Sequence, residues 1–417
     1  MTWTRSNAAP TLIGMVISCS ALSSFAIAAN FESPDSVEST IAQQKAQQLS
    51  WRENLANNGF TFGADYFALG LTSGDGSDGQ SVDASSGVAR LYGAWSLTPS
   101  GRLVWKVEHR HAYGSSTPKN YAFIDNFSGN EGLGYAGLIA PAFSDQGFRV
   151  TDLNWKQTIN DGRGTLIVGW QDVTNYVDVY ALASPWSGFT NLSFSTGSGA
   201  MGLPDDGILA LSAGHMISDQ YYVVAGIADA NGKSDDIFDG FSTVFGSDAA
   251  YFTTLELGWT ASQEQIYTDN VHVTFWHFGE GTRHNLNYPT PGYTDGGKGI
   301  NFSWSQFFTP QIMPFVRGGY SQGQVALYDK SLSAGLGYFG LGSANNNLGF
   351  AFNWSEINEE ILQPIAHSEQ QWTTELYYNM QFGDYVQITP DIQYIKDPSF
   401  SNESSAWVFG VRARLFI

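Results

Sequence analysis

The sequence has only one cysteine, Cys19, among its 417 residues. Cys19 lies inside an apolar run, residues 12–27, which is closed by the small residues Ala28 and Ala29. This pattern is typical of a cleaved secretory signal at residues 1–29, so we expect cleavage after Ala28 or Ala29 and a mature chain that contains no disulfide. The alternative is a lipoprotein signal, because the four residues that end at Cys19 resemble a lipoprotein cleavage box.

Beyond that run, the sequence lacks the stretch of about 20 apolar residues that a membrane-spanning helix needs. It also lacks basic residues, with 19 Lys and Arg against 39 Asp and Glu, which argues against nucleic acid as a partner. There is no Gly-x-Ser-x-Gly motif or phosphate loop, and the histidines lack metal-ligand spacing. We therefore expect no enzymatic activity, no cofactor and no metal. The weak alternative is a divalent cation at Asp75, Asp78 and Asp83, which only partly match a calcium loop.

The last eleven residues alternate strictly between two kinds of side chain. One face is apolar and consists of Trp407, Phe409, Val411, Ala413, Leu415 and Ile417. The opposite face carries Arg412 and Arg414. Because lipid lies outside a transmembrane barrel and water lies inside, a strand that closes such a barrel needs both faces. The ending therefore predicts an all-β fold, a bacterial outer-membrane barrel.

Alternation of this kind recurs along the chain and predicts a 16-stranded antiparallel transmembrane β-barrel, with strands of about 10 residues. The predicted first residues are Phe60, Val88, Arg102, Phe148, Gly164, Gly207, Gln220, Tyr251, Val271, Gly299, Met313, Ser331, Asn347, Gln371, Tyr385 and Ser405. An even number of strands brings both ends of the barrel to the periplasmic side. We thus predict a signal peptide at 1–29, a short N-terminal periplasmic leader helix at 30–58 and the barrel at 59–417.

Short turns and long connections alternate along the chain. The short turns include residues 98–101, 160–163, 218–219, 309–312 and 383–384, which are rich in turn-forming residues. The long connections span approximately residues 114–147, 173–206, 230–250, 279–298 and 358–370. Short periplasmic and long extracellular connections are a property of outer-membrane barrels. A soluble β-sandwich is not expected to show this alternation of short and long connections.

Residues 36–57 precede the first strand, contain no Pro or Gly, and predict a helix. We expect this leader helix to lie solvated in the periplasm. A helix that plugs the barrel or contacts peptidoglycan is the alternative.

Extending the alternation through the barrel assigns charged and aromatic side chains to a water-filled lumen. The charged members are Arg90, Lys106, Glu108, Arg110, Asp152, Lys156, Arg317, Glu375, Asp391, Arg412 and Arg414. The aromatic members are Tyr92, Trp276 and Tyr377, with Trp170, Tyr176, Tyr180 and Trp186 on or near the connection 173–206. Opposite charges across a pore favour polar solutes, and aromatic rings suit the C–H faces of sugars. The alternatives are that the charges only pair across strands and that the loop aromatics only pack the loop.

Four stretches of the sequence share features with one protein family. They are residues 51–60, residues 169–172 with 189–191, residues 388–398 and residues 407–416. They resemble the OprB family of carbohydrate-selective porins, and the Thr-Pro-Asp-Ile-Gln-Tyr-Ile block followed by the Trp-Val-x-Gly-x-Arg ending is the most specific part. The resemblance implies a sixteen-stranded barrel, an inward-folded loop and passive uptake of glucose and related sugars. The sequence departs from other outer-membrane barrels at Ile417, where an aromatic residue is usual.

We therefore predict an outer-membrane porin for passive diffusion of glucose-like mono- and oligosaccharides into the periplasm of a Gram-negative bacterium. Its constriction is expected where the connection 173–206 meets a basic wall of Arg90, Arg110, Arg412 and Arg414. A less selective pore or a channel for small organic acids is the alternative, and an outer-membrane enzyme or adhesin is a more distant one. Expected partners are sugars, outer-membrane lipid and lipopolysaccharide. A homotrimer is also considered because porins are often trimers, although no segment identifies a subunit contact.

Overall fold

The computed structural model describes residues 31, 33–43, 50–122, 132–247, 249–281, 295–362 and 366–416. The predicted signal peptide, its lipoprotein alternative at Cys19, and Ile417 all lie outside the described residues. Within the described ranges, no helix is both long enough and apolar enough to cross a membrane.

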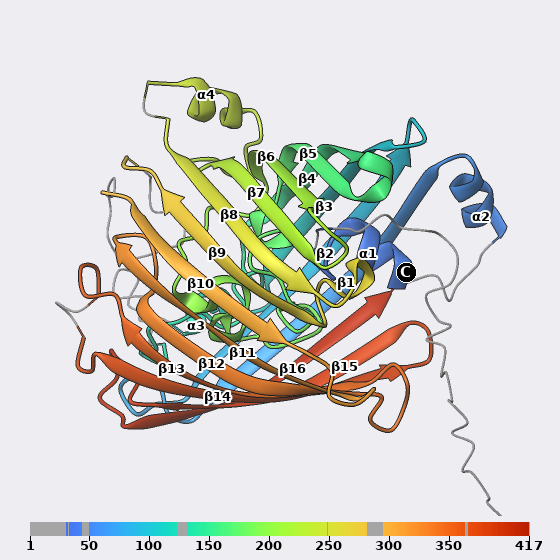
Figure 1. Ribbon diagram of the computed structural model, residues 1–417. Helices are drawn as coiled ribbons and strands as arrows, with labels where there is room; N and C mark the ends of the chain where they lie inside the picture. Colours follow the sequence, from blue (N-terminus) through green and yellow to red (C-terminus); the bar gives the residue numbers. More distant parts are fainter. Residues whose placement is uncertain are drawn as a thin grey trace, which may run out of the picture.

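Sixteen strands form one closed antiparallel barrel, as the alternation predicts (Figure 1). The strands are β1 Phe60–Ser73, β2 Val82–Ser96, β3 Gly101–Ala112, β4 Gly147–Ile159, β5 Gly164–Gln171, β6 Ile208–Met216, β7 Tyr221–Asp229, β8 Tyr251–Thr260, β9 Asn270–Phe278, β10 Gly297–Ser305, β11 Ile312–Gly323, β12 Tyr328–Phe339, β13 Asn347–Ile357, β14 Gln370–Phe382, β15 Val386–Lys396 and β16 Ser405–Phe416. β2 begins at Val82 rather than at the predicted Val88, because the small and polar residues 83–87 give no clear period-two signal. β1 pairs with β16 and so closes the barrel, which leaves no open sheet edge.

The faces of the strands follow the predicted alternation. On β16 the outward side chains Trp407, Phe409 and Val411 are about half exposed, whereas the inward side chains Arg412 and Arg414 are buried. An exposed apolar outer wall of this kind matches a hydrocarbon surrounding. The closing strand therefore has the two faces that its sequence predicts.

The leader forms two short helices, α1 Val37–Gln43 and α2 Ser50–Asn57. α1 packs against the inner face of β1, β2 and β3, so this part of the leader lies inside the barrel and not in solvent (Figure 1). Residues 53–58, which include most of α2 and the residue after it, are exposed. α1 therefore lies inside the barrel, as the alternative expectation has it, whereas α2 lies at the surface.

Short turns gather at one end of the barrel and long connections at the other, with the four-residue connection 324–327 as an exception at the second end. Among the residues that the structure describes, parts of two long connections fold into the barrel. The connection 113–146 contains α3 Pro118–Tyr121, and the connection 172–207, here called the inner loop, contains the short 3-10 helices η2 Val173–Asn175, η3 Leu192–Phe194 and η4 Thr196–Gly199.

The inner loop and the connection 113–146 bury apolar side chains against the inner wall. Phe189 and Phe194 of the inner loop cluster with Phe315 and Tyr377 of the strands, and Phe143 clusters with Phe67 of β1. The interior is therefore partly dry. This differs from the expected flooded lumen, because the loops replace water with packed side chains.

The remaining helical segments lie at the rims. α4 Asp239–Phe245 belongs to the connection between β7 and β8 and projects beyond the barrel wall (Figure 1). The 3-10 helices η1 Asn160–Gly162 and η5 Gln263–Gln265 form parts of turns at the opposite end.

Candidate functional site

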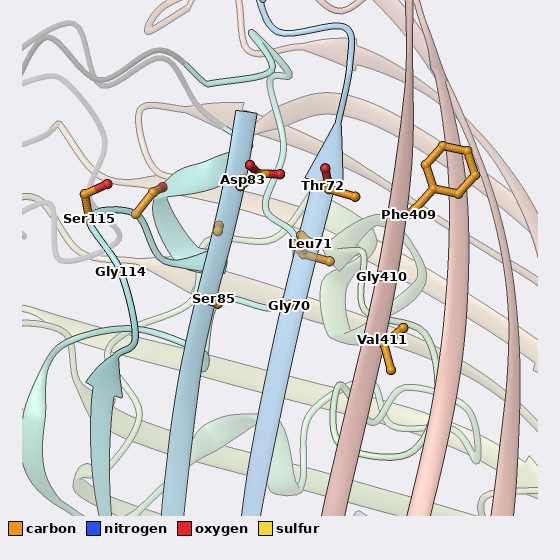
Figure 2. A pocket seen from close by; sticks show the side chains of 12 residues that line it. Gly70, Leu71, Thr72, Asp83, Ser85, Gly114, Ser115, Phe409, Gly410 and Val411 are labelled. Carbon is orange, nitrogen blue, oxygen red and sulfur yellow. The ribbon is translucent and has the colours of Figure 1, made fainter. Parts of the chain in front are cut away.

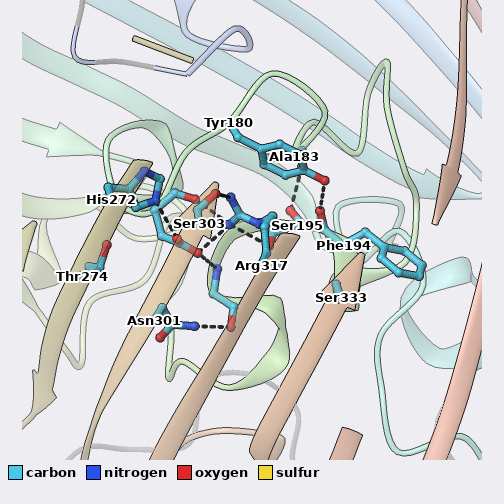
Figure 3. A network of polar contacts seen from close by, with 12 residues as sticks. Tyr180, Ala183, Phe194, Ser195, His272, Thr274, Asn301, Ser303, Arg317 and Ser333 are labelled. Atoms are coloured by element: carbon cyan, nitrogen blue, oxygen red, sulfur yellow. Dashed lines mark hydrogen bonds and ion pairs between the residues drawn. The ribbon is translucent and has the colours of Figure 1, made fainter. Parts of the chain in front are cut away.

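The first half of the inner loop is fixed to the barrel wall by polar and charged side chains of three strands, of which His272 and Arg317 are seen in Figure 3. Asp178 of the loop accepts a hydrogen bond from Nη2 of Arg317 on β11 at 2.6 Å, and Nε2 of His272 on β9 lies 2.9 Å from its other oxygen. The backbone N–H of Asp178 donates to Glu256 on β8 at 2.9 Å. The Arg317 and Asp178 side chains are fully buried. Because a buried charge without its partner is costly, these contacts hold the loop in place.

The middle of the inner loop is held by two further strands, β14 and β16. Glu375 on β14 accepts hydrogen bonds from the backbone N–H and the hydroxyl of Thr190, at 2.6 and 3.0 Å, and from the N–H of Asn191 at 3.0 Å. Arg412 on β16 donates to the carbonyl oxygen of Pro185 at 2.6 Å. Glu375 and Arg412 therefore hold the backbone of the inner loop in place through hydrogen bonds.

A row of ion pairs runs along the inner face of β1 to β4 and β16. Arg90 and Arg414 both bind Asp65, each through an Nη2 to Oδ2 contact of 2.7 Å. Lys106 pairs with Asp152 at 3.0 Å on the neighbouring strands β3 and β4. Two adjacent strands thus present opposite charges at the same level of the barrel.

The row continues toward the end of the long connections. Arg110 binds Glu108 at 2.6 Å and also pairs with Asp206, which follows the inner loop's last helix. Arg149 on β4 binds Asp205 at 2.6 Å and Asp206 at 3.3 Å. We call the whole row the charged wall; its basic members are Arg90, Lys106, Arg110, Arg149 and Arg414, and its acidic members are Asp65, Glu108, Asp152, Asp205 and Asp206.

The loop residues at this wall have shifted pKa values. Burial and the neighbouring charge of Asp206 raise the pKa of Asp205 to about 6. Burial alone would also raise the pKa of Asp206, but the charges of Arg110 and Arg149 lower it below the usual range. Burial lowers the pKa of Lys119, in the connection 113–146, to about 8. Two groups near the wall thus titrate on either side of neutral pH.

An aromatic ring of the inner loop faces the charged wall. The guanidinium of Arg90 lies 4.5 Å from the centre of the Trp186 ring, within the range of a cation–π contact. Trp186 also packs on Phe67, with the ring centres 4.9 Å apart. Tyr176 and Tyr180 are buried as Trp186 is, and they pack the loop: the Tyr180 hydroxyl donates to the carbonyl of Phe194 at 2.8 Å.

The structure places all but one of the predicted lumen residues on the inner face. Those in the charged wall are Arg90, Lys106, Glu108, Arg110, Asp152 and Arg414. Those covered by the inner loop, by α1 or by other inward side chains are Tyr92, Lys156, Trp276, Arg317, Glu375, Tyr377, Asp391 and Arg412. The inner face therefore has two parts: the charged wall, and a set of side chains that supports the inner loop or is covered by α1 and other inward residues.

Trp170 is the exception, and its predicted place in the lumen is wrong. Trp170 is still part of β5, where the next residue, Gln171, points inward and accepts a hydrogen bond from Ser212. Alternation then turns Trp170 outward, where it contacts Phe241 of α4 with the ring centres 5.1 Å apart.

The expected basic wall of Arg90, Arg110, Arg412 and Arg414 also needs a correction. Arg412 belongs to the loop support, and carboxylates pair with the other three. The wall is consequently balanced in charge, with five basic and five acidic side chains, and is not basic.

Several residues of the site have no signal in the alternation. Asp178, Asp205 and Asp206 lie in or beside a loop, where period two does not apply. Arg149 was missed for a different reason: the register shifts between Lys106 and the next residue of β3, so that Arg149 and Asp152 both face inward. A bulge of this kind reverses the parity of the residues beyond it.

A separate hollow lies on the outer side of the barrel, where β1, β2 and β16 meet residues 114–116 (Figure 2). Its volume is about 540 Å³. Gly70 leaves the space open, since nothing lies within 4 Å of the position of a Cβ there, and the outward side chains Phe409 and Val411 border it. Because these side chains face away from the lumen, the hollow is no part of the pathway through the barrel.

A closed sixteen-stranded antiparallel barrel with an inward-folded loop and an apolar outer wall defines an outer-membrane porin. The sequence profile of the family described as "Carbohydrate-selective porin, OprB family" matches residues 105–415. The chain therefore belongs to the OprB family of carbohydrate-selective porins, which are channels and not enzymes. This confirms the resemblance drawn from the sequence.

Solved structures support the same fold. The high-pH structure of Pseudomonas putida OprB aligns with a TM-score of 0.70 and 16% identity, over 88% of this chain and 96% of that one. The low-pH structure of the same protein aligns with a TM-score of 0.51 and 14% identity, over 88% and 96%. The outer-membrane channel DcaP of Acinetobacter baumannii aligns with a TM-score of 0.51 and 8% identity, over 86% and 97%. No curated protein matches the sequence.

Proposed function

We propose that this porin conducts glucose-like mono- and oligosaccharides passively across the outer membrane, along the charged wall. The observation that carries the proposal is the balance of five basic and five acidic side chains, which lie on the inner face of the barrel and at the end of the inner loop that meets it, next to the ring of Trp186. Sugars present hydroxyls that both donate and accept hydrogen bonds. A wall that alternates donors and acceptors without net charge suits a neutral, hydroxylated solute.

Passage requires binding that is weak enough for release. Each charged group of the wall already has a protein partner, so a sugar hydroxyl competes for a hydrogen bond and does not fill an empty site. The buried Trp186 ring packs on Arg90 and Phe67 beside this wall, and so holds the Arg90 guanidinium in place next to the proposed pathway. Short-lived contacts at several places would guide the solute without chemistry or an energy source.

Single-channel conductance with glucose titration tests this proposal most directly. We expect glucose to block the ion current in a saturable way, and liposomes that contain the protein to swell faster in sugars than in amino acids of matched size. Equal swelling rates would contradict the sugar selectivity.

A channel for small organic acids is the second candidate. The basic inner residues favour it, but their pairing with carboxylates does not. A preference for anions over cations that the change Arg110→Ala abolishes would support the organic-acid channel over the sugar channel.

We further propose that lipid and lipopolysaccharide surround the apolar outer wall. The exposed outward side chains of β16 support this proposal.

We also propose a homotrimer, because porins are often trimers. Native mass spectrometry in a mild detergent tests this proposal, because a monomer mass alone would exclude the homotrimer.

A further inference from the structure

The segment formed by residues 33–41, here called the leader segment, runs inside the barrel. The backbone N–H of Ser33 donates to the carbonyl of Asn175, in the inner loop, at 2.5 Å, and the Ser33 hydroxyl donates to the Asn175 side chain at 3.2 Å. Val37 is 2% exposed and clusters with Tyr92, Ala94 and Val104, which lie on the inner face of the barrel. The leader segment therefore bridges the inner loop and the inner face of the barrel.

Phe31, two residues before the leader segment, packs into a complementary space on the inner face of the barrel. Phe31 is 5% exposed and packs beside Tyr222, with the ring centres 6.1 Å apart. Gly214 on β6 makes this seat possible, because a Cβ at residue 214 would lie only 2.3 Å from the Phe31 ring. A side chain at this inward position would displace the ring.

Two basic residues of β3 and β4, outside the charged wall, bind an acidic side chain of the leader segment. Glu38 accepts from Nε of Arg102 at 2.8 Å and from Nζ of Lys156 at 2.5 Å. Burial alone would raise the pKa of Glu38, but the charges of Lys156 and Arg102 lower it, so the carboxylate stays ionised. Glu38 thus compensates positive charge on this part of the inner face.

These contacts lie near the end of the short turns. Arg102 is the second residue of β3, directly after the turn that joins it to β2, and Ala94 lies shortly before that turn. Figure 1 shows α1 inside this end of the barrel, close to the C-terminal end of β16. The charged wall extends from here toward the long connections, so a solute would meet the wall and the leader segment one after the other.

We propose that the leader segment is a fixed part of the pore lining, which narrows the channel at the short-turn end and sets its charge there through Glu38. The role in transport rests on the proposed channel function, but the ion conductance does not depend on which solute the channel carries. Apolar burial at both Phe31 and Val37 and the ion pairs of Glu38 support a fixed position over transient entry.

Conductance in potassium chloride across planar bilayers tests the proposal with the full-length protein and two variants. Deletion of residues 33–41 is expected to raise the single-channel conductance about twofold, because it widens the narrow part of the pore. The change Gly214→Leu should also raise it, since the new side chain expels Phe31 and loosens the segment without removing residues. A conductance equal to that of the unchanged protein in both variants would overturn the proposal.

The effect of the Glu38 charge at the short-turn end is measured separately, as ion selectivity. The change Glu38→Gln should shift the reversal potential in a salt gradient toward anion preference, because Arg102 and Lys156 lose their ionic partner. The matched control is Glu53→Gln, in the exposed helix α2, which should leave the reversal potential unchanged. An identical potential for Glu38→Gln and the unchanged protein would overturn the role of Glu38.

Two further measurements keep these outcomes interpretable. The mobility of heated and unheated samples in detergent gels shows whether each variant forms its barrel. Glucose titration of the same channels separates the two proposals: absence of glucose block in the unchanged protein counts against the sugar channel, whereas the conductance change tests the leader segment alone.

Discussion

Nη2 of Arg317 lies 2.6 Å from Oδ2 of Asp178, although 139 residues separate the two in sequence. One belongs to a central part of β11 and the other to the inner loop, and both side chains are fully buried. The pair therefore connects the wall of the barrel to the loop that narrows it. The loop position depends on charges that the strand pattern alone would assign to water.

We expect the change Arg317→Met to destabilise the barrel by about 3–5 kcal/mol, because it leaves the Asp178 carboxylate buried without its ionic partner. Unfolding in guanidinium chloride, followed by tryptophan fluorescence in lipid vesicles, measures this change. The matched control is Lys330→Met, which removes an ion pair to Glu356 on the barrel surface and should leave the unfolding midpoint unchanged. Equal midpoints for both variants would contradict the anchoring role of Arg317.

Period two was sufficient to predict the strands, because a barrel wall with lipid on one side and the interior on the other requires it at nearly every residue. The same rule correctly placed Arg317 and Glu375 on the inner face. It could not predict their partners, Asp178 and Thr190, since a loop has no period from which its side-chain directions follow. The balance of the charged wall was hidden partly for the same reason, because Asp205 and Asp206 lie outside the strands. Asp65 does lie on β1, but the inward residues that follow it, Phe67, Leu69 and Leu71, are apolar, so this strand shows no polar face.

Sugar binding should depend on the charged wall and not on the outward face. We expect Arg110→Gln to weaken glucose block about tenfold, because a hydrogen bond to a charged group contributes about 1.5–3 kcal/mol. Current noise analysis during glucose titration gives the dissociation constant.

Trp170→Ala is the control for Arg110→Gln. The Trp170 ring lies on the outside of β5 against Phe241, so its removal should not change the dissociation constant of glucose. Block that is weakened by Trp170→Ala and unaffected by Arg110→Gln would place the sugar pathway elsewhere.

The predicted signal peptide sets the first residue of the mature protein. We expect N-terminal sequencing of protein from outer membranes to begin at Ala29 or Asn30, and the change Cys19→Ser to leave export unaffected. A mature chain that begins at a lipidated Cys19, detected from its mass, would instead establish the lipoprotein alternative. The leader segment would still follow in both cases.

The ion preference of the channel should change with pH in two steps. When the pH falls through about 6, Asp205 takes up a proton because its pKa is raised, so the charged wall loses one negative charge and the preference for cations decreases. When the pH rises through about 8, Lys119 loses its proton, one positive charge disappears, and the preference for cations increases. Reversal potentials at pH 5, 7 and 9 in the same salt gradient measure both steps.

Single substitutions assign each step to its residue. Asp205→Asn should remove the step between pH 7 and pH 5 and leave the upper one, whereas Lys119→Gln should do the reverse. Asp219→Asn is the control, because this residue lies exposed at a short turn and pairs only at the surface with Arg163. A low-pH step that persists in Asp205→Asn would mean that another group of the lumen takes up the proton. In that case the carboxylate pair of Asp205 and Asp206 would not control the charge of the wall.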